Sequence, residues 1–280
     1  MTGSLWRLLS RTVANPSGRI GLLILALLTA FVLVGPWLLP DPNVMPDLMA
    51  GAVSPGAGHP FGTDQLNRDI LSRVVSGGRI SLSVSALAVA LAILLGALVG
   101  GLAGFYGGWL DGALMRIVDG ALAIPRLFLL LLLVAVWEQM PLGALVLVLG
   151  ATGWFGTSRI VRGEVLRLRE SEFVFAAKAL GAGPGRIIFR HLLPNVAGPL
   201  LVAATLGVGD VILLEAGLSF LGVGVRPPTP SWGGMILDAR SLLTTAPWAS
   251  IFPGLAIVVT VLAVNLIGDA LRGALDPRSA

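Results

Sequence analysis

Long apolar runs without a charged side chain constrain this chain more than any other feature. Residues 20–39 and 80–110 contain no Asp, Glu, Lys or Arg, and a helix needs roughly 20 mostly apolar residues to cross a bilayer. Charged residues make up only 12% of the chain, against about 25% in a soluble domain. We therefore predict an all-α membrane protein with six transmembrane helices, in residues 20–39, 80–110, 113–137, 141–158, 196–225 and 249–268.

The distribution of Lys and Arg predicts which helix ends face the cytoplasm. If the N-terminus lies inside, 14 of the 19 Lys and Arg residues fall in inner segments. Segments rich in Lys and Arg stay in the cytoplasm, so we expect both termini there. We divide the chain into residues 1–78, with the first helix and an external loop, and a five-helix core, residues 79–280, which includes a cytoplasmic loop at 160–195.

Part of that cytoplasmic loop has a pattern that a plain linker would not need. Residues 175–195 read FAAKALGAGPGRIIFRHLLPN, with small residues first, then a glycine-rich turn, then a short amphipathic stretch that ends at Pro194. Glycine permits a positive φ and proline removes a backbone donor. We predict a helix, a sharp turn and a second helix, with Phe189 as an apolar anchor for a partner's groove. The alternative is an ordinary basic loop with interfacial helices.

The spacing in this loop resembles the EAA loop of ABC importer permeases, written E-A-A-x3-G-x9-I-x-L-P. Phe175 replaces the Glu of the pattern and His191 replaces the Ile. The resemblance implies that the loop forms coupling helices that dock into a separate ATPase subunit. Its matching residues are Ala176, Ala177, Gly181, Leu193 and Pro194, and His191 lies in the same loop.

Three further blocks resemble the C-type permeases of dipeptide, oligopeptide and nickel importers. They are residues 59–82, 215–236 and 252–278, and in the first GTDQLNRD replaces the usual GTDxxGRD, with Asn67 in place of Gly. The resemblance implies the type I ABC importer permease fold in a bacterial inner membrane. It implies an ATP-driven, binding-protein-dependent importer of di- and oligopeptides; import of nickel or a nickel chelate is the alternative.

The same resemblance implies the partners of the chain. They are a second permease subunit, two ATP-binding subunits and a periplasmic or extracellular substrate-binding protein, with membrane lipid around the helices. ATP and Mg²⁺ would be bound by the ATPase subunits, and this chain would hold no cofactor of its own.

The residues themselves argue against several other classes of protein. A phosphate-binding loop needs G-x4-G-K-[ST], but the only lysine is Lys178. With no Cys, and with His59 and His191 far apart, we expect no metal site. No catalytic constellation accompanies His191, so we expect no enzyme. No basic tract is long enough for a nucleic-acid arm.

Two acidic residues fall within the fifth predicted helix. A carboxylate in the membrane is costly and needs protein or water around it. Asp210 is a candidate for the translocation path, as a contact for cationic substrate or a proton carrier, or it is structural with Arg126 as a partner. Glu215 is assigned to the path, or to a structural or gating role. A proton- or ion-coupled secondary transporter that uses Asp210 is the alternative from another functional class. Asp119 should pair with Arg116, three residues earlier on one helix face.

Glycines recur every four residues from Gly96 to Gly112. They are Gly96, Gly100, Gly104, Gly108 and Gly112. Small residues at this spacing let helices approach closely in a membrane. We predict a packing face, which is either static or a sliding surface.

The outer loop at residues 224–235 contains several prolines and Trp232. Trp favours the membrane interface. By resemblance, the loop either faces the external binding protein or folds back as a short re-entrant segment.

Overall fold

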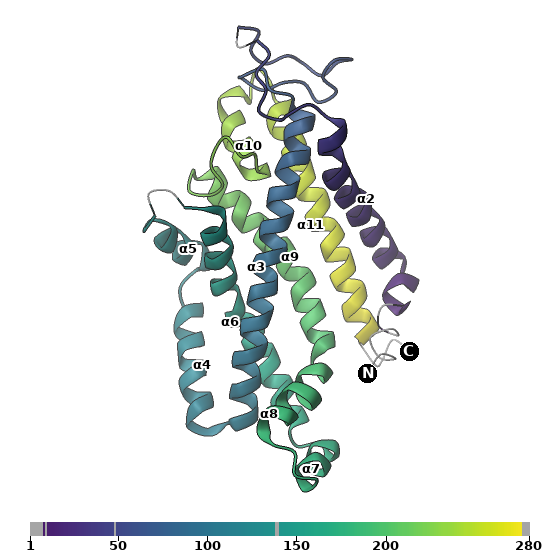
Figure 1. Ribbon diagram of the computed structural model, residues 1–280, viewed down its shortest axis with the longest axis vertical. Helices are drawn as coiled ribbons and strands as arrows, with labels where there is room; N and C mark the ends of the chain where they lie inside the picture. Colours follow the sequence, from purple (N-terminus) through teal and green to yellow (C-terminus); the bar gives the residue numbers. More distant parts are fainter. Residues whose placement is uncertain (1–7, 9, 48, 138–139, 276–280) are drawn as a thin grey trace.

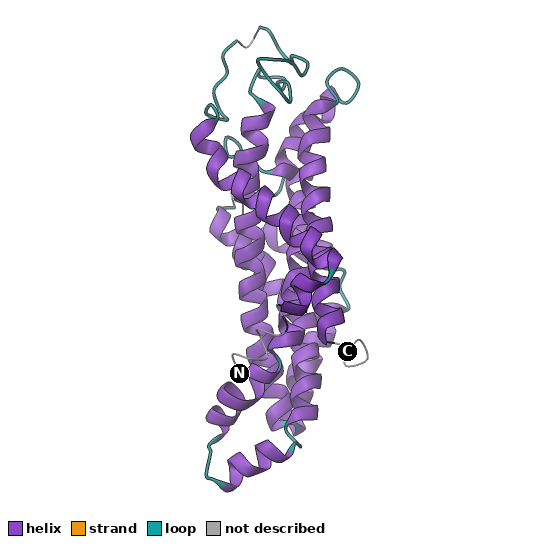
Figure 2. Ribbon diagram, turned by 90° about the vertical axis from the view of Figure 1, so that its right-hand side faces the viewer, coloured by secondary structure: helices purple, strands orange, loops and turns teal. Residues whose placement is uncertain are grey.

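The computed structural model describes residues 8, 10–47, 49–137 and 140–275 of the chain, and they form an elongated helical bundle (Figures 1 and 2). Within these residues the only extended pairing is one isolated bridge between Thr63 and Asp69, so the predicted all-α class is confirmed. Five helices are long and apolar enough to cross a membrane: α2 (Pro16–Leu38), α3 (Ile70–Tyr106), α6 (Leu142–Leu168), α9 (Ala197–Phe220) and α11 (Trp248–Leu275).

The third predicted span, residues 113–137, is broken rather than straight. The structure has α4 (Gly108–Leu122) and α5 (Arg126–Val134), which are bent by 86° to one another. Pro125 lies at the break with an extended backbone. Proline has no N–H for the helix and disfavours a helical residue before it. The single helix expected over residues 113–137 is therefore corrected to a bent pair, which counts as a sixth candidate span only if α4 and α5 cross the membrane together.

Helix α3 is the central column of the bundle. Asp69 caps its N-terminus, where the carboxylate accepts a hydrogen bond from Ser72 N at 2.8 Å. At 37 residues, α3 is about 55 Å long, which exceeds the roughly 30 Å of bilayer hydrocarbon. It packs along α6 and α9, while α11 packs between α9 and α2. Because α3 begins at Ile70, it runs across residue 78, where we place the division of the chain; that division stays a prediction.

Short elements close the two ends of the bundle. At one end lie α7 (Glu172–Ala179), α8 (Pro184–Arg186), a π-helical turn η1 (Ile187–Leu192) and a 3-10 turn η2 (Leu193–Asn195). At the other end lie the loop of residues 39–69, α10 (Trp232–Asp238) and η3 (Ala239–Leu242). We call these the α7 end and the loop end; they are the bottom and the top of Figure 1.

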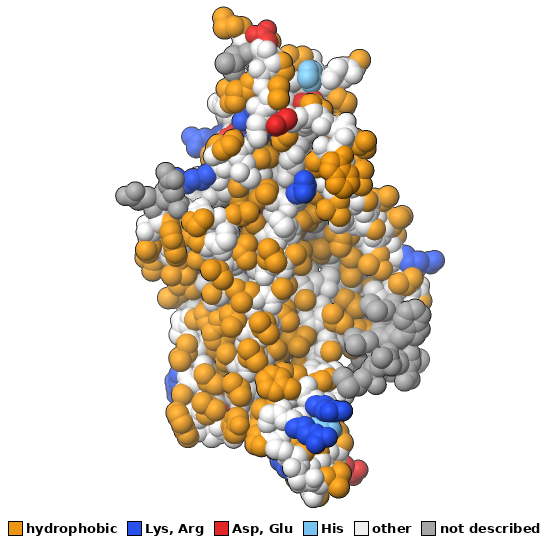
Figure 3. Space-filling view, in the orientation of Figure 1, with side chains coloured by type: hydrophobic (Ala, Val, Ile, Leu, Met, Phe, Trp, Pro, Cys, Tyr) orange, Lys and Arg blue, Asp and Glu red, His pale blue; other side chains and the backbone are white. Residues whose placement is uncertain are grey.

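Apolar side chains cover the middle of the surface in Figure 3, with Lys and Arg above and below them, including a group at the lower tip, around α7 and α8. An apolar band of this kind is the surface that lipid requires. From the Lys and Arg distribution, we expect the α7 end to face the cytoplasm. Residues 1–7 and 276–280 lie outside the described residues, so the predicted cytoplasmic location of both termini stays a prediction.

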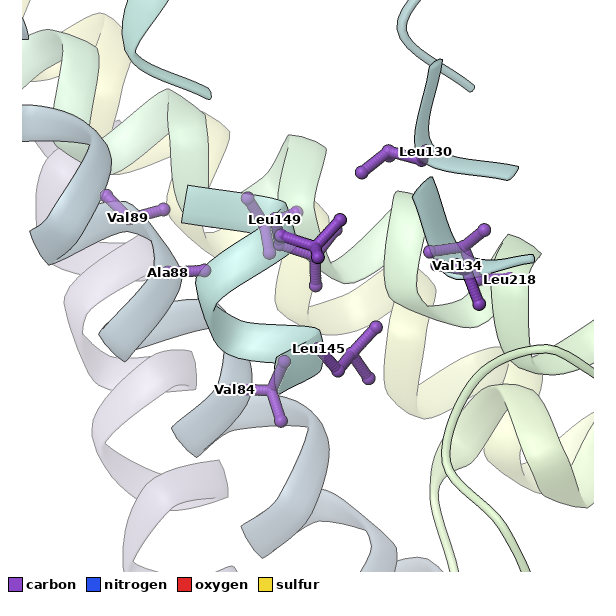
Figure 4. Close-up of a cluster of buried hydrophobic side chains, with 10 residues drawn as sticks. Val84, Ala88, Val89, Leu130, Val134, Leu145, Leu149 and Leu218 are labelled. Carbon is purple, nitrogen blue, oxygen red and sulfur yellow. The ribbon is translucent and has the colours of Figure 1, made fainter. Parts of the chain in front are cut away.

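The largest apolar cluster lies in the bundle interior (Figure 4), along the first half of α3 and of α6, which is the half nearer the loop end. It joins α3, α5, α6 and α9, and we call it the upper cluster. Its buried members are Val84, Ala88, Val89, Leu130, Val134, Leu145, Val148, Leu149, Val211 and Leu218.

Candidate functional site

The α7 end carries a compact helix–turn–helix, residues 172–195, which we call the coupling segment. Helix α7 ends at Ala179, and Gly181 follows with φ +79°. Ala182 N donates to Ala177 O at 3.0 Å and Gly181 N donates to Lys178 O at 2.9 Å. This pair of hydrogen bonds is a Schellman motif, which turns the chain sharply and satisfies the last carbonyls of α7.

The coupling segment is fixed to the bundle through its inner face. Its buried side chains pack against Val161 and Val165 of α6. Asn195 Nδ2 also donates to His191 O at 2.6 Å, which closes the end of the segment just before α9 begins. The inner face consists of Val174, Ile187, Ile188 and Leu192, and Val196, directly after the segment, belongs to the same cluster. The coupling segment is therefore packed on α6 through its buried side chains and leads directly into α9.

The outer face of the coupling segment is apolar and basic. Four large apolar side chains are exposed there, and Lys178, Arg186 and Arg190 lie among them. Lys178 Nζ lies 5.5 Å from the centre of the Phe175 ring. The exposed apolar residues are Phe173, Phe175, Leu180 and Phe189. Such a surface at the basic end of the protein, outside the apolar band, suits a groove on a partner protein.

The residues singled out in the sequence fall on both faces of this segment. Ala176 and Gly181 are exposed, and Ala177 is buried. His191, Leu193 and Pro194 are partly buried. Residue 175, where the EAA pattern has Glu, presents the exposed Phe175 ring to the outside.

A cavity of about 350 Å³ opens in the middle of the chain. Its walls come from α3, α4, α6 and α9, together with Arg126 at the start of α5. In α3 and α6, which run from the loop end to the α7 end, the cavity residues follow those of the upper cluster. Helix α9 runs in the opposite direction, and there the cavity residues precede the residues of the upper cluster, apart from Val211, which belongs to both. The upper cluster therefore lies between the cavity and the loop end.

The two acidic residues of α9 have different surroundings. Asp210 lines the cavity together with Arg126. Glu215 is fully buried and does not line it. Ser81 Oγ donates to Glu215 Oε2 at 2.9 Å and Ser219 Oγ donates to Oε1 at 2.7 Å. These hydrogen bonds connect α3 to the end of α9 beneath the outer loop.

The outer loop folds back into the bundle. Trp232, at the start of α10, is 1% exposed and donates from Nε1 to Val74 O at 2.9 Å. An added Cβ at Gly233 would lie 2.4 Å from Ala216 Cα, so the backbones of α10 and α9 are in direct contact. Trp232 is thus buried inside the protein rather than at the membrane interface where its residue type is common.

Three of the five periodic glycines lie against α6. An added Cβ would lie 2.6 Å from Thr157 Cβ at Gly96, 2.4 Å from Ser158 O at Gly100 and 2.9 Å from Arg162 O at Gly104. The face ends there, because Gly107 leaves the helix with φ +66°. Gly108 and Gly112 would meet nothing within 4 Å, so the expectation that all five share one packing face is corrected to three.

Charged side chains also join the helices toward the α7 end. Arg162 of α6 donates from Nη2 to Asp111 Oδ2 of α4 at 2.6 Å. Asp119 pairs with Arg159 of α6, across 40 residues of sequence. The expected pair of Asp119 with Arg116 is therefore corrected. Among the described residues, no three His, Cys, Asp or Glu side chains group as metal ligands would.

Comparison with known proteins identifies the family of this chain. A family model described as the binding-protein-dependent transport system inner membrane component matches residues 92–280. The chain belongs to this family. It is therefore a multi-pass, non-catalytic permease of the inner membrane, in a binding-protein-dependent transport system. The predicted family, fold and permease role are confirmed, and the secondary-transporter alternative is not supported.

Curated relatives match the permease along nearly its whole length. The oligopeptide transport system permease protein OppC of Salmonella typhimurium is 43% identical, over 98% of this chain and 92% of that protein. The dipeptide transport system permease protein DppC of Bacillus subtilis is 40% identical, over 99% of this chain and 86% of that protein. OppC of Bacillus subtilis is 39% identical, over 98% of this chain and 90% of that protein.

A buried charge network at the loop end of the permease was not expected from the sequence. Asp64 Oδ2 accepts from Arg68 Nε at 2.7 Å and lies 3.6 Å from Arg73 Nε. Both arginines also reach Asp238 of α10, at 3.3 and 3.1 Å. The network ties the external loop to α3 and α10. Asp64 and Arg68 belong to the GTDQLNRD block, but Asp238 lies 170 residues from Arg68, beyond any local pattern.

We expect Asp64→Asn to loosen the external loop. The neutral amide keeps the shape of the side chain but weakens its bonds to two buried arginines, which should cost about 2 kcal/mol, a roughly 30-fold rise in the open population. Limited proteolysis of residues 40–69 from outside should speed up accordingly. Asp41→Asn, which changes an exposed carboxylate in the same loop, should leave the rate unchanged. Equal cleavage rates in the two variants would show that the charge network does not stabilise the external loop.

Proposed function

We propose that this permease is one of two membrane subunits of an ATP-driven importer of di- and oligopeptides. It pairs with a second permease subunit, and the two together contact two ATPase subunits that bind ATP and Mg²⁺. The peptide substrate is supported by the relatives named above, whose names describe dipeptide and oligopeptide transport. Import of nickel or a nickel chelate is the competing substrate within the same family.

The observation that carries the mechanism is the connection of the coupling segment to both walls of the cavity. Helix α7 follows α6 after three residues, and η2 leads into α9. Both α6 and α9 line the cavity. A displacement of the coupling segment therefore reaches two cavity walls through continuous backbone and through the buried inner face. Coupling of this kind needs no deformation of the segment itself.

Alternating access follows from this connection. When two ATPase subunits close on ATP, they pull the coupling segments, and α6 and α9 move apart at the upper cluster. The cavity then opens toward the loop end to accept peptide from the binding protein. Hydrolysis returns the helices, the upper cluster closes, and the cavity faces the cytoplasm. The upper cluster acts as the outer gate because apolar side chains without hydrogen bonds separate at lower cost than a polar network.

Uptake by whole cells tests the substrate. A strain that lacks this chain should lose uptake of labelled trialanine, and expression of the chain should restore it. Uptake of nickel ions should not change. ATPase activity should co-purify with the tagged chain from native membranes. Loss of nickel uptake with unchanged trialanine uptake would transfer the proposal to the metal-importing branch of the family.

A further inference from the structure

The central cavity contains two charged side chains of opposite sign on otherwise neutral walls. Arg126 lies at the start of α5 and Asp210 near the middle of α9. The remaining lining residues carry no charge, and most are apolar or glycine. A charge within a membrane-spanning segment is costly, and it usually marks a path or a partner. The cost of placing each of these two charged side chains in the membrane must therefore be offset by the groups that it contacts.

Arg126 is held in place but is only partly satisfied. Its Nη2 donates to Leu149 O at 2.9 Å. An added Cβ at Gly153 would lie 3.0 Å from this Nη2, so the glycine leaves the room that the guanidinium occupies. Its Nε is buried without a hydrogen-bond partner among the described residues. A guanidinium has five N–H donors, so a fixed cation with spare donors lines the cavity.

Asp210 has no such anchor. It is exposed, and within the described part of the chain no hydrogen bond or salt bridge is formed by its carboxylate, which attracts the Arg126 guanidinium only through the electrostatic interaction of the two charges. Its neighbours on the cavity wall are Leu206, Gly207 and Val211, which offer no polar side chain. The carboxylate therefore presents its full acceptor capacity to the cavity.

From this pair we propose a transit site for short peptides with both termini free. The C-terminal carboxylate is bound by Arg126 and the N-terminal ammonium by Asp210. A volume of about 350 Å³ is at the small end of ligand sites, which span about 300–1,000 Å³. The inference rests on the proposed peptide function and adds to it the residues that contact the peptide during passage.

A dipolar ligand fits this pair better than a simple ion does. A metal cation would be repelled by Arg126 and would find one carboxylate where hard cations take six or more oxygens. An anion would be repelled by Asp210. A zwitterionic peptide satisfies both charges at once, and its side chains rest on apolar walls such as Ala92 and Ile93, which carry no group that selects a particular sequence.

A single introduced thiol can report on occupancy, because the chain has no cysteine. Gly156 lines the cavity, is exposed, and would place a new Cβ in open space. In the purified importer that carries Gly156→Cys, we expect trialanine to slow modification by N-ethylmaleimide, read as a mass shift on this chain. N-acetyl-trialanine and trialanine amide, which each lack one terminal charge, should protect at concentrations about tenfold higher, since a charge-assisted hydrogen bond contributes about that factor. Ile160→Cys, also exposed on a cavity wall, is a second reporter.

Neutralising Asp210 should remove the preference for trialanine over N-acetyl-trialanine. With Asp210→Asn added, the half-protecting concentration of trialanine should rise about tenfold, while that of N-acetyl-trialanine should not change. Asp269→Asn, which alters an exposed carboxylate of α11 outside the cavity, should leave both values unchanged. Equal protection by the free and the acetylated peptide, or no protection by trialanine, overturns the transit site. Cellular uptake of trialanine is a separate measurement, so the proposed peptide function can stand when this inference fails.

Discussion

Gly100→Leu should prevent the permease from assembling into a stable bundle. An added Cβ at this position would lie 2.4 Å from Ser158 O and 2.8 Å from Val161 Cβ, so even a methyl group requires α3 and α6 to separate. In a membrane these helices are held by close packing rather than by the hydrophobic effect. We expect a loss of about 3 kcal/mol or more, since overpacking typically costs 1–3 kcal/mol and the contact here is with backbone.

The intrinsic preference of Leu for helix cannot offset this loss. Replacing Gly by Leu in a helix gains about 1 kcal/mol at most. Gly112→Leu measures that gain alone, because an added Cβ there meets nothing within 4 Å. The amount of chain in the membrane, and the temperature at which the detergent-solubilised protein aggregates, should fall for Gly100→Leu and hold for Gly112→Leu. Equal behaviour of the two variants would mean that the α3–α6 contact does not hold the bundle together.

The sequence predicted the elements of this fold where the signal was local. Long apolar runs located the five long helices, although the run at 196–225 contains Asp210 and Glu215, and the glycine-rich turn located the coupling segment. Each of these signals depends on residues within one or two helical turns. The glycine face was overextended for a local reason as well. A repeat of four says which residues share a face only while the helix continues, and Gly107 ends α3.

Partners that are distant in sequence could not be predicted in this way. Asp119 pairs with Arg159 of the neighbouring helix α6 and not with Arg116 of its own helix. Tertiary packing decides which of two arginines within reach lies closer. Asp64 and Asp238 share Arg73 only because α10 folds back toward α3, and no periodic pattern in the sequence predicts this fold. The residue type of Trp232 favours the membrane interface, but the packed interior between α3, α9 and α11 buries the side chain, and Val74 O accepts a hydrogen bond from its ring N–H.

The largest functional effect is expected from Gly181→Arg, which should abolish uptake while the protein remains in the membrane. Gly181 has φ +79°, a conformation that costs an L-residue with a side chain roughly 1–2 kcal/mol. Helix α7 has only eight residues, so the chain can relieve this strain by giving up the Schellman turn. Helix α7 would then change its angle to η1, and the outer face that presents Phe175 and Phe189 would be lost. ATPase activity should no longer co-purify with the tagged chain.

The turn and the added charge can be separated with a neighbour. Gly183 is also exposed, with open space around it, but its φ is −69°, which any residue adopts. Gly183→Arg adds the same charge two residues away and should retain uptake and the co-purifying ATPase. Gly181→Asn should retain most of both, because Asn tolerates a positive φ better than other residues do. Native uptake by Gly181→Arg, or equal loss in Gly183→Arg, would show that the backbone turn does not set the docking surface. Loss of uptake in Gly181→Arg with normal uptake in Gly183→Arg would show that coupling depends on the backbone turn at Gly181. A rigid segment transmits force only in the direction that its turn fixes.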